Sequence, residues 1–241
     1  MEILSKNNPL IKDLAKLKQK KYRTERNKML VEGERAIKEL IARNAEIDYI
    51  FYADSPLSST QNQIKCSEIV LRELSQTVSP SNYVAVVSIP NMVFKPPSTS
   101  FLVLENVLDP GNMGTLIRTS LAFDFRTIYL VNCVDPTNDK VLRSCMGNFW
   151  DVNLIECSID DIESLSKKYP LVVADMGGEK LENTPKLNSI FGIVLGNEAN
   201  GVSEKMRSLA SHVVSISMKN NVESLNVAVA GAIIMNYFKG E

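Results

Sequence analysis

Polar side chains gather in three stretches of this 241-residue sequence, each beginning where an apolar segment ends. The stretches are ENVLDPGNMGTLIRTS (105–120), VLGNEANGVS (194–203) and ISMKNNVESLN (216–226). Any one of them has a purely structural explanation, because such residues form turns, cap helices or extend a guanidinium out of an apolar helix. Together they supply amides, hydroxyls, a carboxylate and a guanidinium, which are groups that bind and orient a polar ligand.

The segments that precede these stretches predict a sheet that would bring them together. Apolar strand candidates lie at 101–107, 126–132, 171–175, 191–196 and 212–217, and helical segments separate them. This alternation is typical of an α/β domain whose parallel sheet is covered on both faces. Open parallel sheets bind ligands at the carboxyl ends of their strands. Because the three polar stretches follow three of these strands, we expect them to form one site.

Several other kinds of site are excluded by the sequence. It contains no G-x-G-x-x-G and no G-x-x-x-x-G-K-[ST], so the usual dinucleotide and P-loop sites are not expected. Four cysteines without a C-x-x-C pair and one histidine, His212, cannot assemble a thiolate or imidazole metal cluster. We therefore expect no metal, and His212 is interpreted as a structural residue at the start of a strand.

A second, smaller α/β unit is expected before this sheet. Helices are predicted at 31–44 and 67–75, and strands at 47–53 and 82–89. The segment PNMVFKPPSTS (90–100) lacks periodicity and is rich in Pro, Ser and Thr, which is typical of a linker. We therefore predict two domains, residues 1–95 and 96–241.

The first thirty residues form a basic arm. They hold nine Lys and Arg against three acids, a net charge of +6, whereas the whole chain carries −1. Asn8-Pro9 predicts the start of a helix, with Lys12, Lys16 and Lys20 on one face. Most lysine faces of this kind are simply solvated, so the pattern alone favours that interpretation over a surface that binds a polyanion.

The three polar stretches resemble, in order and spacing, the three motifs of the SpoU/TrmH branch of the SPOUT RNA methyltransferases. The matching residues are Asn112, Gly114, Arg118 and Thr119 in the first, Leu195, Gly196, Glu198 and Gly201 in the second, and Ile216, Met218, Glu223, Ser224, Leu225 and Asn226 in the third. The likeness is close over 101–241. More loosely, NPLIKDLAKLKQKKYR and LVEGERAIKEL resemble the ribosomal-protein-like substrate-binding domain of ribosomal RNA methyltransferases in this family. That likeness shifts the basic arm towards RNA binding, through Lys12, Lys16, Lys20, Lys21 and Arg23.

The resemblance implies a 2′-O-ribose methyltransferase that uses S-adenosylmethionine and has a trefoil knot in its C-terminal domain. It implies that the cofactor is held by backbone groups around Leu195, Gly196, Ile216, Met218 and Leu225. It also implies that Asn112, Glu198, Ser224 and Asn226 order the motif loops and the target nucleotide. Arg118 would bind an RNA phosphate and orient the hydroxyl, since a guanidinium is too weak a base to remove a proton at neutral pH. Glu198 could equally be structural, because a carboxylate at a strand end often accepts hydrogen bonds from nearby amides.

The sequence departs from the family pattern at three places. Ala199 stands where the second motif often has glycine, Asp124 stands where glycine commonly ends the first-motif helix, and the third motif has Lys219-Asn220-Asn221-Val222 without a glycine. Asparagine tolerates the left-handed conformation, so Asn220 or Asn221 is expected to replace that glycine. These changes bear on the shape of the loops and the affinity for the cofactor more than on the reaction.

The resemblance further implies a homodimer. The C-terminal helix is apolar nearly all round from Leu225 to Phe238, so we expect Ile233, Ile234 and Tyr237 in or beside the interface. The cysteine pattern and the lack of a signal sequence favour a cytoplasmic protein with no membrane association.

Ribosomal RNA is favoured as the substrate because of the N-terminal domain. The alternatives are a transfer RNA ribose methyltransferase and a non-catalytic RNA-binding or ribosome-assembly factor with the same fold. An α/β enzyme that acts on small molecules is disfavoured by the missing phosphate loops and by the basic arm.

Overall fold

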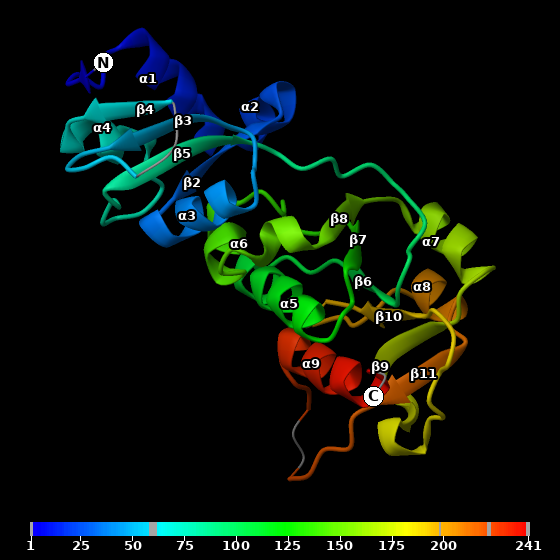
Figure 1. Cartoon of the computed structure of the whole chain (residues 1–241). Helices are drawn as coiled ribbons and strands as arrows, with labels where there is room; N and C mark the ends of the chain where they lie inside the picture. The colour runs from blue at the N-terminus through cyan, green and yellow to red at the C-terminus, as the bar shows by residue number, and fades with distance from the viewer. Residues whose placement is uncertain (1, 58–61, 198, 221–222, 240–241) are drawn as a thin grey trace. The chain divides into compact units, whose positions relative to one another are not determined.

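The computed structural model describes residues 2–57, 62–197, 199–220 and 223–239. The chain folds into two compact units (Figure 1), one formed by residues 1–90 and 137–142 and the other by residues 91–136 and 143–241. Within the described ranges, every helix is too short or too polar to cross a membrane.

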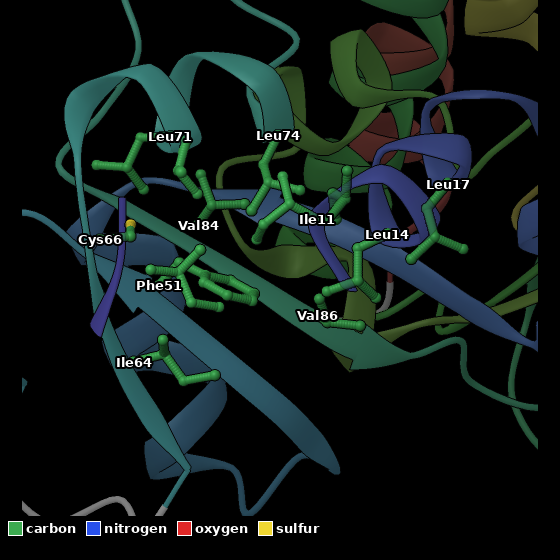
Figure 2. Close-up of a cluster of buried hydrophobic side chains, with 13 residues drawn as sticks. Ile11, Leu14, Leu17, Phe51, Ile64, Cys66, Leu71, Leu74, Val84 and Val86 are labelled. Carbon is green, nitrogen blue, oxygen red and sulfur yellow. The ribbon is translucent and has the colours of Figure 1, made fainter. Parts of the chain in front are cut away.

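The first unit is a mixed sheet covered by short helices. Its strands are β1 (Glu2–Ile3), β2 (Lys28–Glu32), β3 (Ile47–Tyr52), β4 (Gln63–Cys66) and β5 (Tyr83–Ser88), in the spatial order β1-β4-β3-β5-β2. Its helices are α1 (Pro9–Leu14), the 3₁₀ turn η1 (Ala15–Lys18), α2 (Lys20–Arg26), α3 (Glu34–Ala42) and α4 (Glu68–Leu74). Figure 2 shows its core, where Ile11, Leu14 and Leu17 pack with Leu71 and Leu74 over β3 and β5.

Two sequence predictions for this unit are wrong. The helix expected over 31–44 begins only at Glu34, because residues 28–32 form β2, whose buried Met29, Leu30 and Val31 pair with β5. The basic helix is also interrupted. Asn8 caps α1 as expected, but Gln19 has extended backbone angles and a new helix begins at Lys20. Lys12, Lys16 and Lys20 therefore do not share the face of one helix.

The second unit contains a six-stranded sheet in which every strand pair is parallel. The strands are β6 (Phe101–Glu105), β7 (Thr127–Val131), β8 (Asn153–Glu156), β9 (Leu171–Lys180), β10 (Gly192–Leu195) and β11 (His212–Ser215), in the order β11-β9-β10-β6-β7-β8. All five predicted strands are present, and the three fully buried ones, β10, β6 and β7, lie next to one another. The predicted α/β class, with a parallel C-terminal sheet and a smaller N-terminal unit, is confirmed. The trefoil knot stays a prediction.

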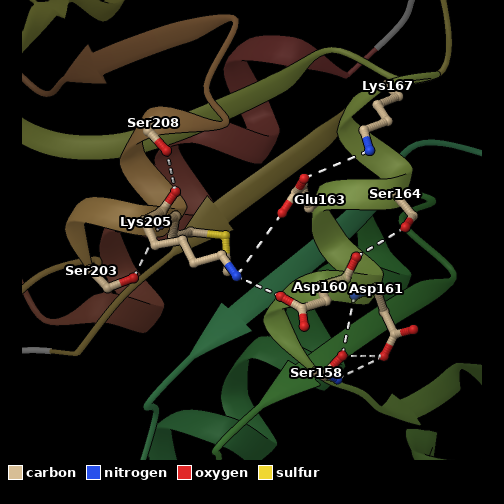
Figure 3. Close-up of polar contacts among 10 residues, drawn as sticks. Ser158, Asp160, Asp161, Glu163, Ser164, Lys167, Ser203, Lys205 and Ser208 are labelled. Atoms are coloured by element: carbon tan, nitrogen blue, oxygen red, sulfur yellow. Dashed lines mark hydrogen bonds and ion pairs between the residues drawn. The ribbon is translucent and has the colours of Figure 1, made fainter.

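Helices cover both faces of this sheet. The helices of the second unit are α5 (Pro110–Ala122), α7 (Ile159–Ser166), α8 (Glu204–Ser208) and α9 (Val227–Phe238), with the 3₁₀ turns η2 (Asn148–Asp151) and η3 (Leu181–Asn183). Helix α6 (Asp139–Ser144) begins in the first unit. Ile162 and Leu165 of α7 and Met206 of α8 share a buried cluster with the sheet. Figure 3 shows that Lys205 of α8 also pairs with Asp160 and Glu163 of α7. Helices α5 and α9 lie side by side on the other face (Figure 1).

Candidate active site

The carboxyl end of β6 joins the first polar stretch to the second. Glu105 ends the strand with only 3% of its surface exposed, and one of its carboxylate oxygens accepts a hydrogen bond from Ser203 N at 2.8 Å. The next residue, Asn106, turns the chain with a left-handed φ of 55°. Its carbonyl accepts a hydrogen bond from Asn197 Nδ2 at 3.0 Å. Residues 105 and 106 therefore hold both ends of the loop that follows β10.

The first and third stretches meet through two asparagines. Asp109 caps α5 by accepting a hydrogen bond from Asn112 N at 2.8 Å. Asn226 caps α9 by accepting hydrogen bonds from Ala228 N and Val229 N. Asn226 Nδ2 also donates to Asn112 Oδ1 at 2.9 Å, a bond between residues 114 positions apart. The first turns of α5 and α9 are thus fixed against each other, and their amide-rich ends share one polar junction.

The loop after β10 is too tight for a side chain at its first residue. A Cβ on Gly196 would lie 2.3 Å from both the carbonyl carbon and the oxygen of Gly201. Asn197 and Gly201 exchange two backbone hydrogen bonds, of 2.9 and 2.8 Å, and Asn197 Oδ1 accepts from Ala199 N. Leu195 and Gly196 are buried at the base of this loop. Glu198, predicted to act in the site, lies outside the described residues.

The third stretch leaves β11 as an irregular segment. Ile216 and Met218 are half-buried, and Ser217 between them donates a hydrogen bond to Glu182. Asn220 has a φ of 61°, which confirms the expectation that an asparagine takes the left-handed position of the missing glycine; Asn221 lies outside the described residues. Asp124, which also stands where glycine is common, has a φ of 64°. Ser224 is exposed and Leu225 is half-buried beside the cap of α9.

A second glycine sets how closely α9 approaches the site. A Cβ on Gly231 would lie 2.7 Å from Leu195 Cδ1 and 2.8 Å from Leu116 Cδ2. Helix α9 therefore packs against both β10, just before Gly196, and α5, one turn after Asn112. This contact keeps the Asn112–Asn226 junction close to the end of β10.

Arg118 extends out of an otherwise apolar helix. Its neighbours in the sequence, such as Leu116 and Ile117, predict an apolar setting that would require an anionic partner. In the structure Arg118 is exposed, and its Nη1 lies 3.0 Å from Met146 Sδ. Within the described part of the chain its guanidinium has no carboxylate partner. The reason is helical spacing, because Arg118 shares a face with Gly111, Thr115 and Ala122 rather than with the buried leucines. It also lies about 9 Å along the helix axis from Asn112, at a rise of ~1.5 Å per residue.

The predicted RNA-binding residues of the first unit divide into two groups. Lys12, Lys16, Lys20 and Lys21 are exposed, and Lys16 pairs with Asp13 at 3.1 Å. Asp13 also forms a two-pronged contact with Arg26 at 2.6 and 2.8 Å, and this hydrogen bonding lowers the pKa of the Asp13 carboxyl to about 2.

Arg23, in contrast, is only 5% exposed. Its Nε donates to Thr137 Oγ1, and its Nη1 donates to the carbonyls of Leu17 and Lys18. Because these contacts bury the guanidinium, Arg23 stabilises the fold of the first unit. The proposed RNA-binding surface therefore does not include Arg23.

Sequence reasoning missed two residues that build the site. Glu105 is a lone carboxylate at the end of a strand whose other residues are apolar, a signal that was visible in the sequence. Asn197 stood beside Glu198 in the second stretch but was assigned no role. Its contact with Asn106, 91 positions away, could not be read from local pattern.

Comparison with known proteins assigns both units. A model of the SpoU rRNA Methylase family matches residues 99–236, and a model of the MRM3-like substrate binding domain matches residues 8–85. The chain is 29% identical to the Bacillus subtilis 23S rRNA (guanosine(2553)-2′-O)-methyltransferase RlmP, over 99% of each chain. It is also 29% identical to an uncharacterized tRNA/rRNA methyltransferase of Synechocystis, over 97% of this chain and 91% of the relative.

Solved structures agree over the whole length. The crystal structure of an RNA 2′-O ribose methyltransferase superposes with a TM-score of 0.84 at 25% identity, covering 98% of this chain and 97% of the other. An AdoMet-bound rRNA methyltransferase from Sinorhizobium meliloti has the same fold, with a TM-score of 0.88 at 23% identity over 98% and 96% of the two chains. With each unit matched over most of its length by a family model, the chain belongs to the SpoU rRNA methylase family.

Proposed function

We propose that the protein is an S-adenosylmethionine-dependent methyltransferase that modifies the 2′-hydroxyl of a ribose in ribosomal RNA. The observation that carries the proposal is the bond between Asn226 and Asn112, which joins two of the three motif segments at one end of the sheet. The Asn197–Asn106 bond adds the remaining segment. The relative matched over 99% of both chains is a 23S rRNA guanosine 2′-O-methyltransferase, which favours ribosomal RNA over transfer RNA.

The predicted cofactor residues are suited to S-adenosylmethionine. In the described part of the chain, Ile216, Met218 and Leu225 make no backbone hydrogen bond, so their amides and carbonyls are available to a polar ligand. Their own half-buried side chains offer apolar surface beside these groups. S-adenosylmethionine, when bound there, supplies a methyl group on a positively charged sulfur.

The chain's own residues position the acceptor. Displacement at the methyl carbon requires the ribose oxygen to be held in line with the sulfur–carbon bond. Asn112 and Asn226 fix the two helix starts that border this space. Arg118, exposed and without a carboxylate partner in the described residues, is proposed to bind an RNA phosphate in a two-pronged contact. Ser224 is exposed beside Asn226 and is proposed to contact the nucleotide. Glu198, which lies outside the described residues, keeps its proposed role in ordering the motif loops and the target nucleotide.

The first unit is proposed to bind the RNA substrate. Its exposed lysines surround Tyr22, whose ring has Lys16 Nζ and Lys21 Nζ within 5.9 and 5.7 Å of its centroid. Phosphate binding by such side chains releases counterions and so depends on salt.

A homodimer is also part of the proposal. Val229 and Ile233 of α9 are 49% and 39% exposed and lie one turn apart, so they form an apolar strip on the surface. Ile234, which we expected at the interface, is only 1% exposed within the protomer and belongs to its core. Tyr237 is half-buried, with its hydroxyl bound to Thr184 O.

Light scattering of Ile233→Lys tests the interface, with Met176→Lys, another exposed apolar site, as the control. A monomeric parent at micromolar concentration would contradict it.

The activity is tested by methyl transfer to RNA. Purified protein and labelled S-adenosylmethionine are incubated with ribosomal RNA and, separately, transfer RNA from a strain that lacks the gene, and the modified position is mapped. The first position to inspect is the guanosine in 23S rRNA that the Bacillus relative modifies. Transfer only to transfer RNA would establish the alternative substrate. RNA binding without transfer to either would establish a non-catalytic factor.

The substrate and the four free cysteines favour a cytoplasmic location.

A further inference from the structure

Glu105 is a buried carboxylate for which folding stability gives no sufficient reason. It is 3% exposed, and Ser203 N is its one hydrogen-bond donor within the described residues. A single amide replaces only part of the water that a carboxylate loses on burial, so an apolar side chain at this point would give a more stable strand. The other four residues of β6 are apolar and buried. The carboxylate is therefore explained by its hydrogen bond to Ser203, at the end of the loop after β10.

Glu105 holds the far end of the loop after β10. Ser203 is the N-cap of α8, where its hydroxyl accepts a hydrogen bond from Met206 N. At the near end, Asn197 binds the carbonyl of Asn106, the residue after Glu105. The loop is thus attached at both ends to two consecutive residues of the first motif segment. A charged acceptor gives the shorter and stronger kind of hydrogen bond, and burial keeps water from competing for it.

We propose that Glu105 is a positioning residue for S-adenosylmethionine binding. Its carboxylate fixes the loop after β10 at Ser203, and thereby the backbone of Leu195 and Gly196, in the conformation that receives the cofactor. The inference rests on the proposed function, and it concerns the affinity for the cofactor rather than the methyl-transfer step. Glu105 acts through the loop and does not touch the reacting atoms.

The experiment measures the Kd for S-adenosylmethionine by calorimetry on the full chain. Glu105→Met fills a similar volume but cannot accept the hydrogen bond, whereas Glu105→Gln keeps an acceptor oxygen. Loss of one buried hydrogen bond to a charged group predicts a Kd raised roughly tenfold or more for Glu105→Met and less than about threefold for Glu105→Gln. In steady-state assays, the KM for the cofactor should rise while kcat at saturating cofactor stays near the parent value. The control is Ile155→Val in β8, a buried substitution that should lower the melting midpoint without changing Kd.

Parental affinity in Glu105→Met would overturn the inference, and so would equal losses in the Met and Gln variants. If Glu105→Met fails to fold, Ser203→Pro and Ser203→Ala replace it. Both variants lose the cap hydroxyl, but only proline removes the Ser203 N–H, and the φ of −67° at this position suits a proline ring. Equal affinities in this pair would refute the role of the Glu105 contact. A parent that binds no cofactor would refute the proposed function itself.

Discussion

Replacing Arg118 by alanine should separate catalysis from folding. The side chain is exposed, and its single contact in the described structure is with the sulfur of Met146, a weak acceptor. Surface substitutions of this kind change the free energy of unfolding by less than about 0.5 kcal/mol. The melting midpoint should therefore fall by no more than about 2 °C.

The expected loss of activity is much larger. A two-pronged contact with phosphate comprises two hydrogen bonds to charged groups, each contributing about 1.5–3 kcal/mol. Losing the pair in the transition state corresponds to at least about 3 kcal/mol, or a hundredfold fall in kcat/KM for RNA. Arg118→Lys should recover little, because an ammonium cannot reproduce the planar fork.

Three measurements on each variant decide the matter: thermal melting, S-adenosylmethionine binding by calorimetry, and transfer of labelled methyl to RNA. Arg126→Ala is the matched control, since Arg126 is also exposed in the second unit and pairs locally with Asp124. Cofactor binding should be unchanged in both variants. An Arg118→Ala protein that transfers methyl at the parental rate would refute the assignment, whatever its stability.

Three further predictions concern the loops and the basic arm. Gly196→Ala should abolish cofactor binding and lower the melting midpoint, because its Cβ would meet the Gly201 backbone at 2.3 Å; parental calorimetry would show that the loop adapts. Asn226→Asp should keep the α9 cap but lose the donor to Asn112. The free energy of unfolding should therefore change by less than about 1 kcal/mol, while kcat falls. An unchanged kcat would make that bond purely structural. Neutralising the exposed lysines 12, 16, 20 and 21 should reduce the slope of log affinity for RNA against log salt, by roughly 0.7 per lost contact on single strands. Arg23→Ala should instead destabilise the first unit, because Arg23 is buried. An unchanged slope would mean that the lysines form an ordinary solvated surface.

The sheet of the second unit was predictable because buried parallel strands read as continuous apolar runs, as in FLVLE and TIYLV. Strand β8 was not predicted because NLIE has only two apolar residues between polar ends. Strand β2 was not predicted because its apolar residues directly precede helix α3 and continue its helical pattern. The exposure of Arg118 could have been found from helical spacing.

Other features depend on contacts that local pattern does not encode. Burial of Arg23 requires Thr137, 114 positions away, and grouping of 137–142 with the first unit requires the same long-range packing. The Asn112–Asn226 bond likewise became visible only in three dimensions. Motif resemblance located the segments, but it did not say which side chains touch.

The bond between Asn112 and Asn226 also bears on the order of events during synthesis. All six strands of the second sheet are translated before α9 leaves the ribosome, so the polar junction cannot form on a nascent chain that stops short of Asn226. Until then, Leu116 and Leu195 lack the helix that packs over them and expose apolar surface to which chaperones bind. The proposed active site, which includes this junction, is therefore completed only after α9 has been synthesised.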